Sequence, residues 1–291
     1  MSSKQSLFLT FTCLNLMTFS FATSADDIDI EALDASHRSK LSGQKVFQID
    51  GLKGVTILAG ADVKLIKSTE ECNQFPRFRS EGSVISIIAN SQRLNELEIS
   101  YVNGYFRVEG LGAAQGSVDS TLQIRIYVDD IESIEMGQNN RQKLTISLGQ
   151  NSKMLIGNIT AHDVNIDMQG HGSLIVGELR SESLRINLDG HGKLNFPQVH
   201  TESMDVTMNG HGEVELNGSV YTQKVSMSGH GNYNAANLDS IQAALYVRGH
   251  AKTNLSVSGG LNLDVDNTDN VRYLGNPLIT RSAEELRLSA L

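Results

Sequence analysis

Five histidines recur along this chain at intervals of about twenty residues, each directly after a glycine. Gly-His-Gly occurs at 170–172, 190–192, 210–212 and 229–231, and Gly-His-Ala follows at 249–251. Imidazoles at a regular spacing could do two kinds of chemistry. Their ring nitrogens are good ligands for transition metals such as Zn or Cu, and neutral rings can stack as a polar ladder. The histidines concerned are His171, His191, His211, His230 and His250.

The residues around each tripeptide predict where these rings point. Apolar side chains alternate with polar ones, as in Val164, Ile166 and Met168, which is typical of a strand with one buried face. By this parity the histidines face outward. If successive units stack, the rings form one column with a spacing of roughly 4.8 Å, the distance between paired strands. A metal shared by two or three rings is the alternative to a ladder that only packs and hydrogen-bonds.

The residues next to the histidines do not favour a dedicated metal site. A metal-binding histidine usually has a carboxylate or carbonyl behind it, but neither flanking column supplies a regular carboxylate. The preceding column is Gln169, Asp189, Asn209, Ser228 and Arg248, and the following column is Ser173, Lys193, Glu213, Asn232 and Lys252. Protonation of such a column would set like charges side by side. We therefore expect the fold to weaken as the pH falls through roughly 6.5.

The glycines have a structural explanation that needs no ligand. We interpret them as two inward positions that lack a side chain, so that the backbone can bend without a Cβ clash. A "GQN" at 149–151 aligns as an earlier member, with Gly149 placed 21 residues before Gly170, and a second "GQN" stands at 137–139. The glycines assigned this role are Gly170, Gly172, Gly190, Gly192, Gly210, Gly212, Gly229, Gly231 and Gly249.

A unit of twenty residues cannot enclose a core alone, so neighbouring units must stack. Each unit offers two strand-like runs joined at the glycines and a shorter third side, such as 177–183 or 197–203. This pattern predicts a parallel β-helix, with its array of coils over about 137–262. The signature of leucine-rich repeats and the glycine-rich motif of calcium-binding β-rolls are both missing.

Period-two alternation also precedes the array. Residues 45–66 predict two or three short strands, and 121–136 alternate again. Within 97–110, Asn103-Gly104 supplies the two positive-φ residues of a type I′ hairpin turn. Residues 26–44 are polar and predict a flexible lead-in, and 280–291 predict a C-terminal tail.

The first 25 residues read as a signal peptide. Lys4 precedes an apolar run over 7–22, and small residues at 22–25 offer a cleavage site. The run is short for a membrane span of roughly 20 residues, and no second hydrophobic segment follows. We expect an exported mature chain, periplasmic, outer-membrane-associated or extracellular, with no transmembrane segment. Because Cys13 lies in the apolar run, Cys72 would be its single cysteine and could form no internal disulfide.

Composition and motifs exclude several functions. The net charge of −9 and a pI near 5.4 argue against a nucleic-acid partner. There is no G-x-S-x-G, H-E-x-x-H, C-x-x-C or phosphate loop, and no pair of acidic residues suited to glycoside hydrolysis can be picked out. The segment "DVDNTDN" at 264–270 lacks the spacing and glycine of a calcium loop and predicts a solvated turn.

The order of these segments resembles the GIN domain, a bacterial family described as the head of an auto-transporter adhesin. "FQIDGLKGVTILAGADVKLI", "LQIRIYVDDIESIEMGQN", the glycine-paired coils and the closing "YLGNP" at 273–277 carry the resemblance, which covers about 45–279. It implies a right-handed parallel β-helix-like protein of the envelope or exterior, with structural glycines and no established catalytic residues. The residue between the glycines is commonly small in relatives, whereas here it is histidine in five coils.

The sequence therefore predicts an all-β, non-enzymatic binding or adhesion module with no cofactor. Its partner would be an extracellular or envelope ligand, a glycan or a protein. Two alternatives stay open. One is capture of Zn or Cu by the histidine column. The other is a polysaccharide-acting β-helix enzyme, which would gather two carboxylates, or a carboxylate with Lys or Arg, in one cleft.

Overall fold

The computed structural model describes residues 43–59, 61–67, 82–110, 122–136, 143–149 and 151–281, in two compact units that divide after Gln142. The predicted signal peptide, Cys13, Cys72, most of the lead-in, the "GQN" at 137–139 and residues 282–291 lie outside the described residues. None of the helices in the described ranges is both long and apolar enough to cross a membrane.

The first unit consists of two short sheets. Phe47 of one sheet meets Phe106 of the other edge to face, with ring centroids 5.1 Å apart, so the two sheets share a core. A short helix, α2 (Ser91–Asn95), lies between β4 and β5 in the chain. One sheet has the strand order β1 (Gly43–Ile49), β4 (Ser83–Ala89), β7 (Gln123–Val128) and β3 (Asp62–Lys67). The other has the order β5 (Leu97–Val102), β6 (Tyr105–Gly110), β2 (Gly54–Ile57) and β8 (Ile131–Met136).

The predicted hairpin is confirmed in this unit. β5 and β6 pair antiparallel up to Val102 and Tyr105, and the two residues between them form the turn. Asn103 has a φ of 54° and Gly104 a φ of 92°, as a type I′ turn requires.

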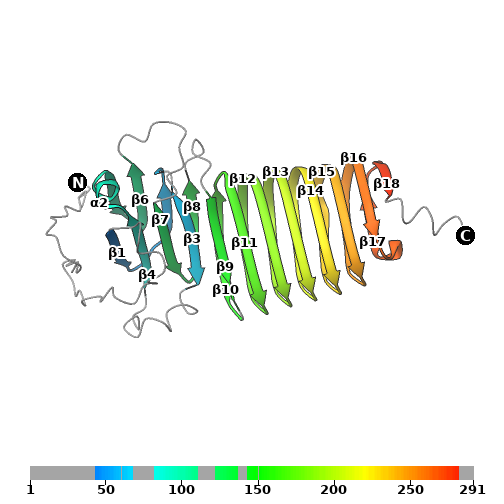
Figure 1. Cartoon of the computed structure of the whole chain (residues 1–291), viewed down its shortest axis with the longest axis horizontal. Coiled ribbons are helices and arrows are strands. Elements are labelled where there is room, and N and C mark those ends of the chain that lie inside the picture. Colours follow the sequence, from blue (N-terminus) through cyan, green and yellow to red (C-terminus); the bar gives the residue numbers. More distant parts are fainter. Residues whose placement is uncertain are drawn as a thin grey trace, which may run out of the picture. The chain divides into compact units, whose positions relative to one another are not determined.

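The second unit is a solenoid, and the predicted parallel β-helix of about twenty-residue coils is confirmed (Figure 1). Residues about twenty positions apart pair in parallel, as Ile186 does with Val206. Its first strands are β9 (Lys143–Leu148), β10 (Lys153–Thr160) and β11 (Asp163–Gly170). The long strands are β12 (Ser173–Gly190), β13 (Lys193–Gly210), β14 (Glu213–Gly229), β15 (Asn232–Gly249) and β16 (Lys252–Val265). The last coil continues through a 3₁₀ turn at Thr268–Asn270, β17 (Val271–Leu274) and β18 (Leu278–Arg281).

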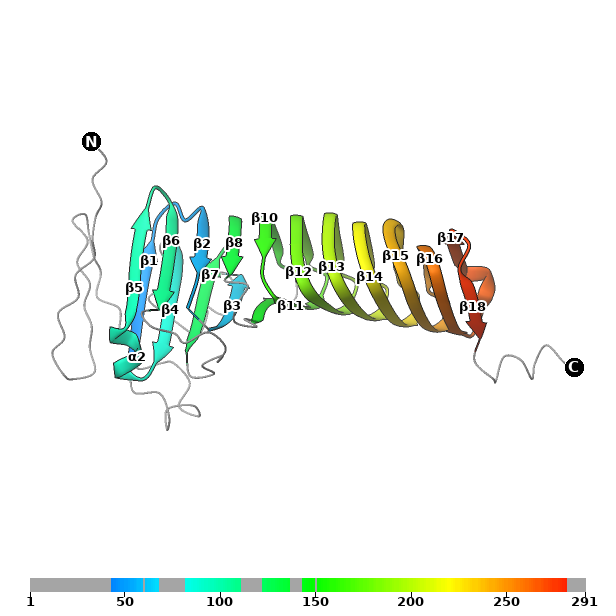
Figure 2. The same cartoon turned by 90° about the horizontal axis from the view of Figure 1, so that it is seen from above.

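The predicted third side of each coil is not a separate element. β12 runs without interruption from Ser173 to Gly190, through the segment 177–183, and the long strands curve from one side of the coil to the next (Figure 2). Backbone hydrogen bonds continue through this bend: Ala161 N donates to Arg180 O at 3.1 Å, and Glu182 N donates to His162 O at 2.9 Å. Each coil therefore turns sharply at the glycines and more gradually along the long strand, where the register shifts in the pairings of β13 with β14, β14 with β15 and β15 with β16.

The interior of the solenoid contains the side chains that the alternation predicts. Ile186, Val206 and Leu245 are almost completely buried, and all lie in one column. Their neighbours along each strand face outward. Residues that occupy the same position in successive coils, about twenty residues apart, therefore form a continuous column on the surface.

The first coil differs from the prediction by one residue. β9 pairs with β11 and β10 with β12 at an offset of 20, which sets Asn151 opposite His171 and Ser152 opposite Gly172. Gly149 is therefore not the counterpart of Gly170, and the predicted spacing of 21 is wrong. A tight turn explains the difference, because Ser152 N donates to Gly149 O at 3.1 Å and closes the corner without a paired glycine.

Candidate functional site

The five histidines lie in a single exposed column at the sharp corner of the coils. The ring centroids of His171 and His191 are 4.7 Å apart, and the following pairs are 4.9, 5.0 and 5.2 Å apart. The rings are nearly parallel, with interplanar angles between 2° and 9°. The column thus matches the strand spacing expected for stacked coils.

Backbone hydrogen bonds set this spacing. The amide of His191 donates to the carbonyl oxygen of Gly170 at 2.8 Å, and the same bond recurs at His211, His230 and His250. The next bond along, from Lys193 N to Gly172 O, measures 2.9 Å. The corner is therefore part of the ladder, and the histidines project from a rigid frame.

The two glycines of each Gly-His-Gly unit have different roles, which corrects the prediction that both face inward. The first is only half-buried and has a positive φ, from 93° at Gly170 to 111° at Gly190 and Gly229. A Cβ on Gly190 would lie 2.7 Å from the carbonyl oxygen of Gly170. The second glycine is buried, and a Cβ on Gly212 would meet the Leu188 side chain at 2.4 Å. One glycine turns the corner and the other makes room for the core.

The observed ring geometry does not hold a metal ion between neighbouring histidines. Two Zn–N bonds of about 2.0–2.1 Å can join nitrogens at most about 4.2 Å apart. Equivalent nitrogens of nearly parallel rings keep the spacing of the rings, which is 4.7 Å or more. In the described part of the chain there is no group of three or more His, Cys, Asp or Glu side chains arranged to hold a metal. A shared ion would require the rings to turn out of the stack.

A second feature is a groove of about 630 Å³ on the gradual bend of the coils. It crosses successive coils from β12 to β18, so residues about twenty positions apart line it side by side. Leu184, Met204 and Ala243, which are buried, line it together with the residues on either side of them in each coil. The polar lining residues are Ser183, Arg185, Ser203, Asp205, Thr222, Gln223, Lys224, Gln242, Asn262 and Thr280.

The charged residues of this groove occupy consecutive coils. Arg185 pairs in register with Asp205, and Asp205 pairs with Lys224. Asp205 is half-buried between the two exposed basic residues. Lys224 Nζ lies 5.8 Å from the centre of the Tyr246 ring, close enough for a cation–π contact. The groove thus contains one carboxylate flanked by two cations, in a lining that is otherwise uncharged.

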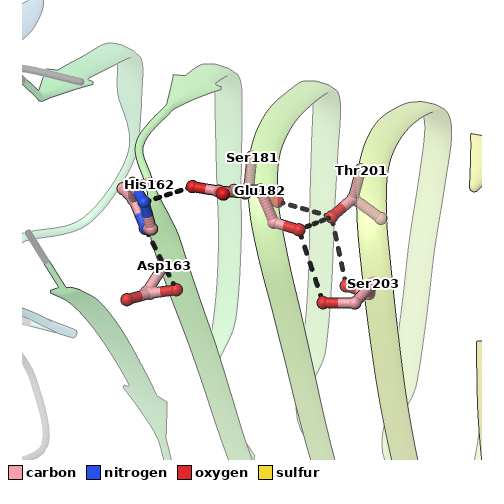
Figure 3. Close-up of polar contacts among 6 residues, drawn as sticks. All are labelled: His162, Asp163, Ser181, Glu182, Thr201 and Ser203. Carbon is pink, nitrogen blue, oxygen red and sulfur yellow. Dashed lines mark hydrogen bonds and ion pairs between the residues drawn. The ribbon is translucent and has the colours of Figure 1, made fainter. Parts of the chain in front are cut away.

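Hydrogen bonds between coils fix the bend beside this groove (Figure 3). Ser181 Oγ donates to Thr201 Oγ1 at 3.1 Å, and Thr201 Oγ1 donates to Glu182 O at 3.2 Å. His162 lies between two carboxylates: it contacts Glu182 through Nε2, and its Nδ1 is 3.3 Å from Asp163 Oδ1. Ser181 contacts Thr201 in the next coil, and His162 contacts Glu182 in the next coil, so these side chains link neighbouring coils.

The segment 264–270 closes the end of the histidine corner. Asp266 Oδ2 accepts a hydrogen bond from Gly249 N at 3.0 Å, and Asp266 N donates to Val247 O at 3.0 Å. Arg248 pairs with Asp264 at 2.8 Å and lies 3.8 Å from Asp266. These carboxylates bind the protein's own cations and amides, in agreement with the predicted turn.

Sequence reasoning found the histidine column but missed the groove. The signal was present: positions 183, 203 and 222 are all small hydroxyl residues, and they recur with the coil period. It was not recognised because alternation alone does not show on which side the strand bends. The groove residues occupy three consecutive positions in each coil, such as 183–185 and 203–205.

Comparison with known proteins gives one family. A family model described as "Putative auto-transporter adhesin, head GIN domain" matches residues 77–277. No curated protein matches the chain.

Several solved structures are similar to this chain, and three of them come from Parabacteroides. One is titled a "Putative lipid binding protein" from Parabacteroides distasonis: it is 14% identical, has a TM-score of 0.44, and the match covers 84% of this chain and 94% of that one. A "putative adhesin" from the same species is 13% identical with a TM-score of 0.32, covering 84% and 93%. Another from Parabacteroides merdae is 18% identical with a TM-score of 0.29, covering 84% and 97%.

Proposed function

The chain belongs to the family described as "Putative auto-transporter adhesin, head GIN domain", and from this premise we propose that it is an exported, non-enzymatic binding module. Its ligand is an extended molecule, a glycan chain or an extended protein segment of the cell exterior or envelope. The ligand lies along the groove at the gradual bend, across successive coils.

The groove is the observation that carries this proposal. Its lining repeats from coil to coil, so it presents Ser183, Ser203 and Thr222 in a row. A row of hydroxyl oxygens at the strand spacing suits a ligand that repeats along its length, because each unit can donate a hydrogen bond to the same kind of acceptor. The backbone ladder holds the row rigid, which lowers the entropy lost on binding.

The test is a screen of the purified protein against a glycan array and against envelope and matrix proteins. In the groove variant Ser203→Arg, a long side chain obstructs the middle of the groove, so binding should fall at least tenfold. Asn195→Arg adds the same charge outside the groove and should bind as the wild type does. Equal binding by both variants, or no binding to any glycan or protein, would contradict the proposal.

A polysaccharide-acting enzyme is the second candidate, favoured by Arg185, Asp205 and Lys224. A carboxylate between two cations on consecutive coils is one of the arrangements expected for cleavage of an acidic polysaccharide. A pair of carboxylates for glycoside hydrolysis is not available in the groove, because Asp205 is the only acidic residue among the described lining residues.

Turnover distinguishes the two candidates. Incubation with a panel of uronate-containing and neutral polysaccharides, followed by assay of new chain ends, should show no release by the wild type. Release that disappears in Asp205→Asn and in Lys224→Met would assign the groove to catalysis and overturn the non-enzymatic proposal.

A further inference from the structure

We propose that the histidine column is a second binding site, which takes an acidic polysaccharide when its imidazoles are protonated. The column defined here comprises His171, His191, His211, His230 and His250. It lies at the sharp corner, whereas the groove lies at the gradual bend of each coil, so this proposal does not depend on the function proposed for the groove.

The column is organised before any ligand arrives. All five rings are exposed, and their faces are covered by one another at 4.7 to 5.2 Å. The ring edges, which carry both nitrogens, are therefore the parts left for a ligand. Because the amides of His191, His211, His230 and His250 are each bonded to the coil below at 2.8 Å, the row has a fixed spacing over four intervals.

The charges around the column nearly cancel while the imidazoles are neutral. In the following column, Lys193 Nζ pairs with Glu213 at 2.7 Å. In the preceding column, Asp189 accepts a hydrogen bond from Asn209, and Arg248 pairs with Asp264 and approaches Asp266. Lys252 completes the charged groups that flank the rings, and the remaining flanking residues are Gln169, Ser228, Ser173 and Asn232. Protonation of the histidines is thus what turns this corner into a row of positive charges.

An extended polyanion is the ligand that such a row favours. Neighbouring imidazolium ions repel one another at this spacing, and anionic groups laid along the row offset the repulsion. Proton uptake and ligand binding must then favour each other, by the reciprocity of linked equilibria. A single small anion would touch one or two rings, whereas a polymer engages the row as a whole and gains from the high local concentration of its further charges.

The charge of the whole molecule favours a single polysaccharide chain over nucleic acid. At a net charge of −9 with neutral histidines, the protein repels a duplex, which is broad and densely charged on all sides. One chain with a carboxylate or sulfate on each repeat can follow a row one ring wide and avoid the acidic surface on either side.

The experiment is calorimetric titration of the purified protein with dextran sulfate, whose charge does not change between pH 5.0 and pH 7.5. We expect at least tenfold tighter binding at pH 5.0 than at pH 7.5, because the imidazoles carry more protons at the lower pH. Titrations near pH 6 in two buffers of different ionisation enthalpy should reveal net proton uptake. Unmodified dextran should not bind to the column at either pH.

The matched variant replaces all five column residues by glutamine, because amide side chains also stack as ladders between paired strands. Circular dichroism and a melting curve check that the coils are retained. In this variant the affinity should change less than twofold with pH, with no proton uptake. The control His162→Gln/His200→Gln, which alters two other described histidines, should keep the wild-type response.

Three results would overturn the proposal. One is the same pH dependence in the glutamine variant, which would place the response elsewhere. The second is no binding at pH 5.0, and the third is tighter binding of a DNA duplex of matched length. Because Ser203→Arg changes the groove alone, it should leave dextran sulfate binding unchanged, which separates a failure of the groove proposal from a failure of this one.

Discussion

The Cβ that a side chain would add at Gly210 lies 2.7 Å from the carbonyl oxygen of Gly190, one coil below. Backbone atoms cannot move aside as a flexible side chain can, and Gly210 also has a φ of 102°. The glycine beside each histidine is therefore required by contact with the next coil and by backbone conformation together.

The first prediction follows from this contact. Gly210→Ala should destabilise the protein by about 1–3 kcal/mol, the usual cost of a strained backbone conformation, with the clash in addition. Gly260→Ala is the matched control, since a Cβ there meets nothing within 4 Å. Denaturant unfolding of both variants gives the two free energies. Equal stabilities would show that the corner tolerates a side chain.

The second prediction concerns Tyr233, which is completely buried inside the coils. Its hydroxyl donates to Gln223 Oε1 at 2.9 Å, and Gln223 Nε2 donates to Ser240 Oγ at 2.8 Å. Tyr233→Phe leaves a buried amide oxygen without this donor, so it should cost about 1–3 kcal/mol of unfolding free energy. Gln223→Leu/Tyr233→Phe removes both partners and should recover part of the loss.

The same residue predicts a dependence on alkaline pH. Burial raises the pKa of the Tyr233 phenol far above its usual value of 10. Above pH 10 the unfolded chain loses this proton while the folded protein keeps it, so stability falls as the pH rises. Between pH 9 and pH 11 the wild type should lose more unfolding free energy than Tyr233→Phe does. Parallel pH profiles would contradict the assignment.

The fourth prediction tests the closure of the histidine corner. Asp266→Ala removes the acceptor of the Gly249 amide and a neighbour of Arg248. Because the site is partly exposed, we expect a loss of about 1 kcal/mol. Amide hydrogen exchange should show faster exchange at Gly249. Asp239→Asn, an exposed change on the same coil, should affect neither measurement.

The fifth prediction concerns transition metals. Titration of the protein with Zn²⁺ and Cu²⁺ at pH 7.5 should give no heat at micromolar metal, because the rings are too far apart to share an ion while they remain stacked. Binding of one ion to each pair of histidines, lost in the five-glutamine variant, would show that the rings leave the stack and that the column captures metal.

Several features of this protein could be predicted from sequence because they depend only on local periodicity. Residues such as Ile186 and Val206 alternate with polar neighbours, and in a strand this alone determines which side chains are buried. A period of about twenty residues forces units to stack, since none can enclose a core alone. Outward histidines on that period must then lie one strand spacing apart. The family resemblance agrees with the match over 77–277.

Other features depend on where the backbone turns, and alternation carries no information about that. Asn151 is opposite His171, because the strands on both sides of this corner pair at an offset of 20 and not 21. The two glycines of each corner look alike in sequence, but contact with the next coil gives them separate roles.

By itself, then, the sequence determined the strands, their buried face, the stacking of the coils and the histidine column, since each follows from spacing along one chain. The tertiary structure alone decided the groove, because the direction in which the backbone bends brings the columns of Ser183 and Arg185 into one lining, and alternation does not give that direction. It also decided that Asp266 accepts a hydrogen bond from Gly249 at the corner. These two residues are 17 positions apart, so the repeat of about twenty residues does not predict their contact.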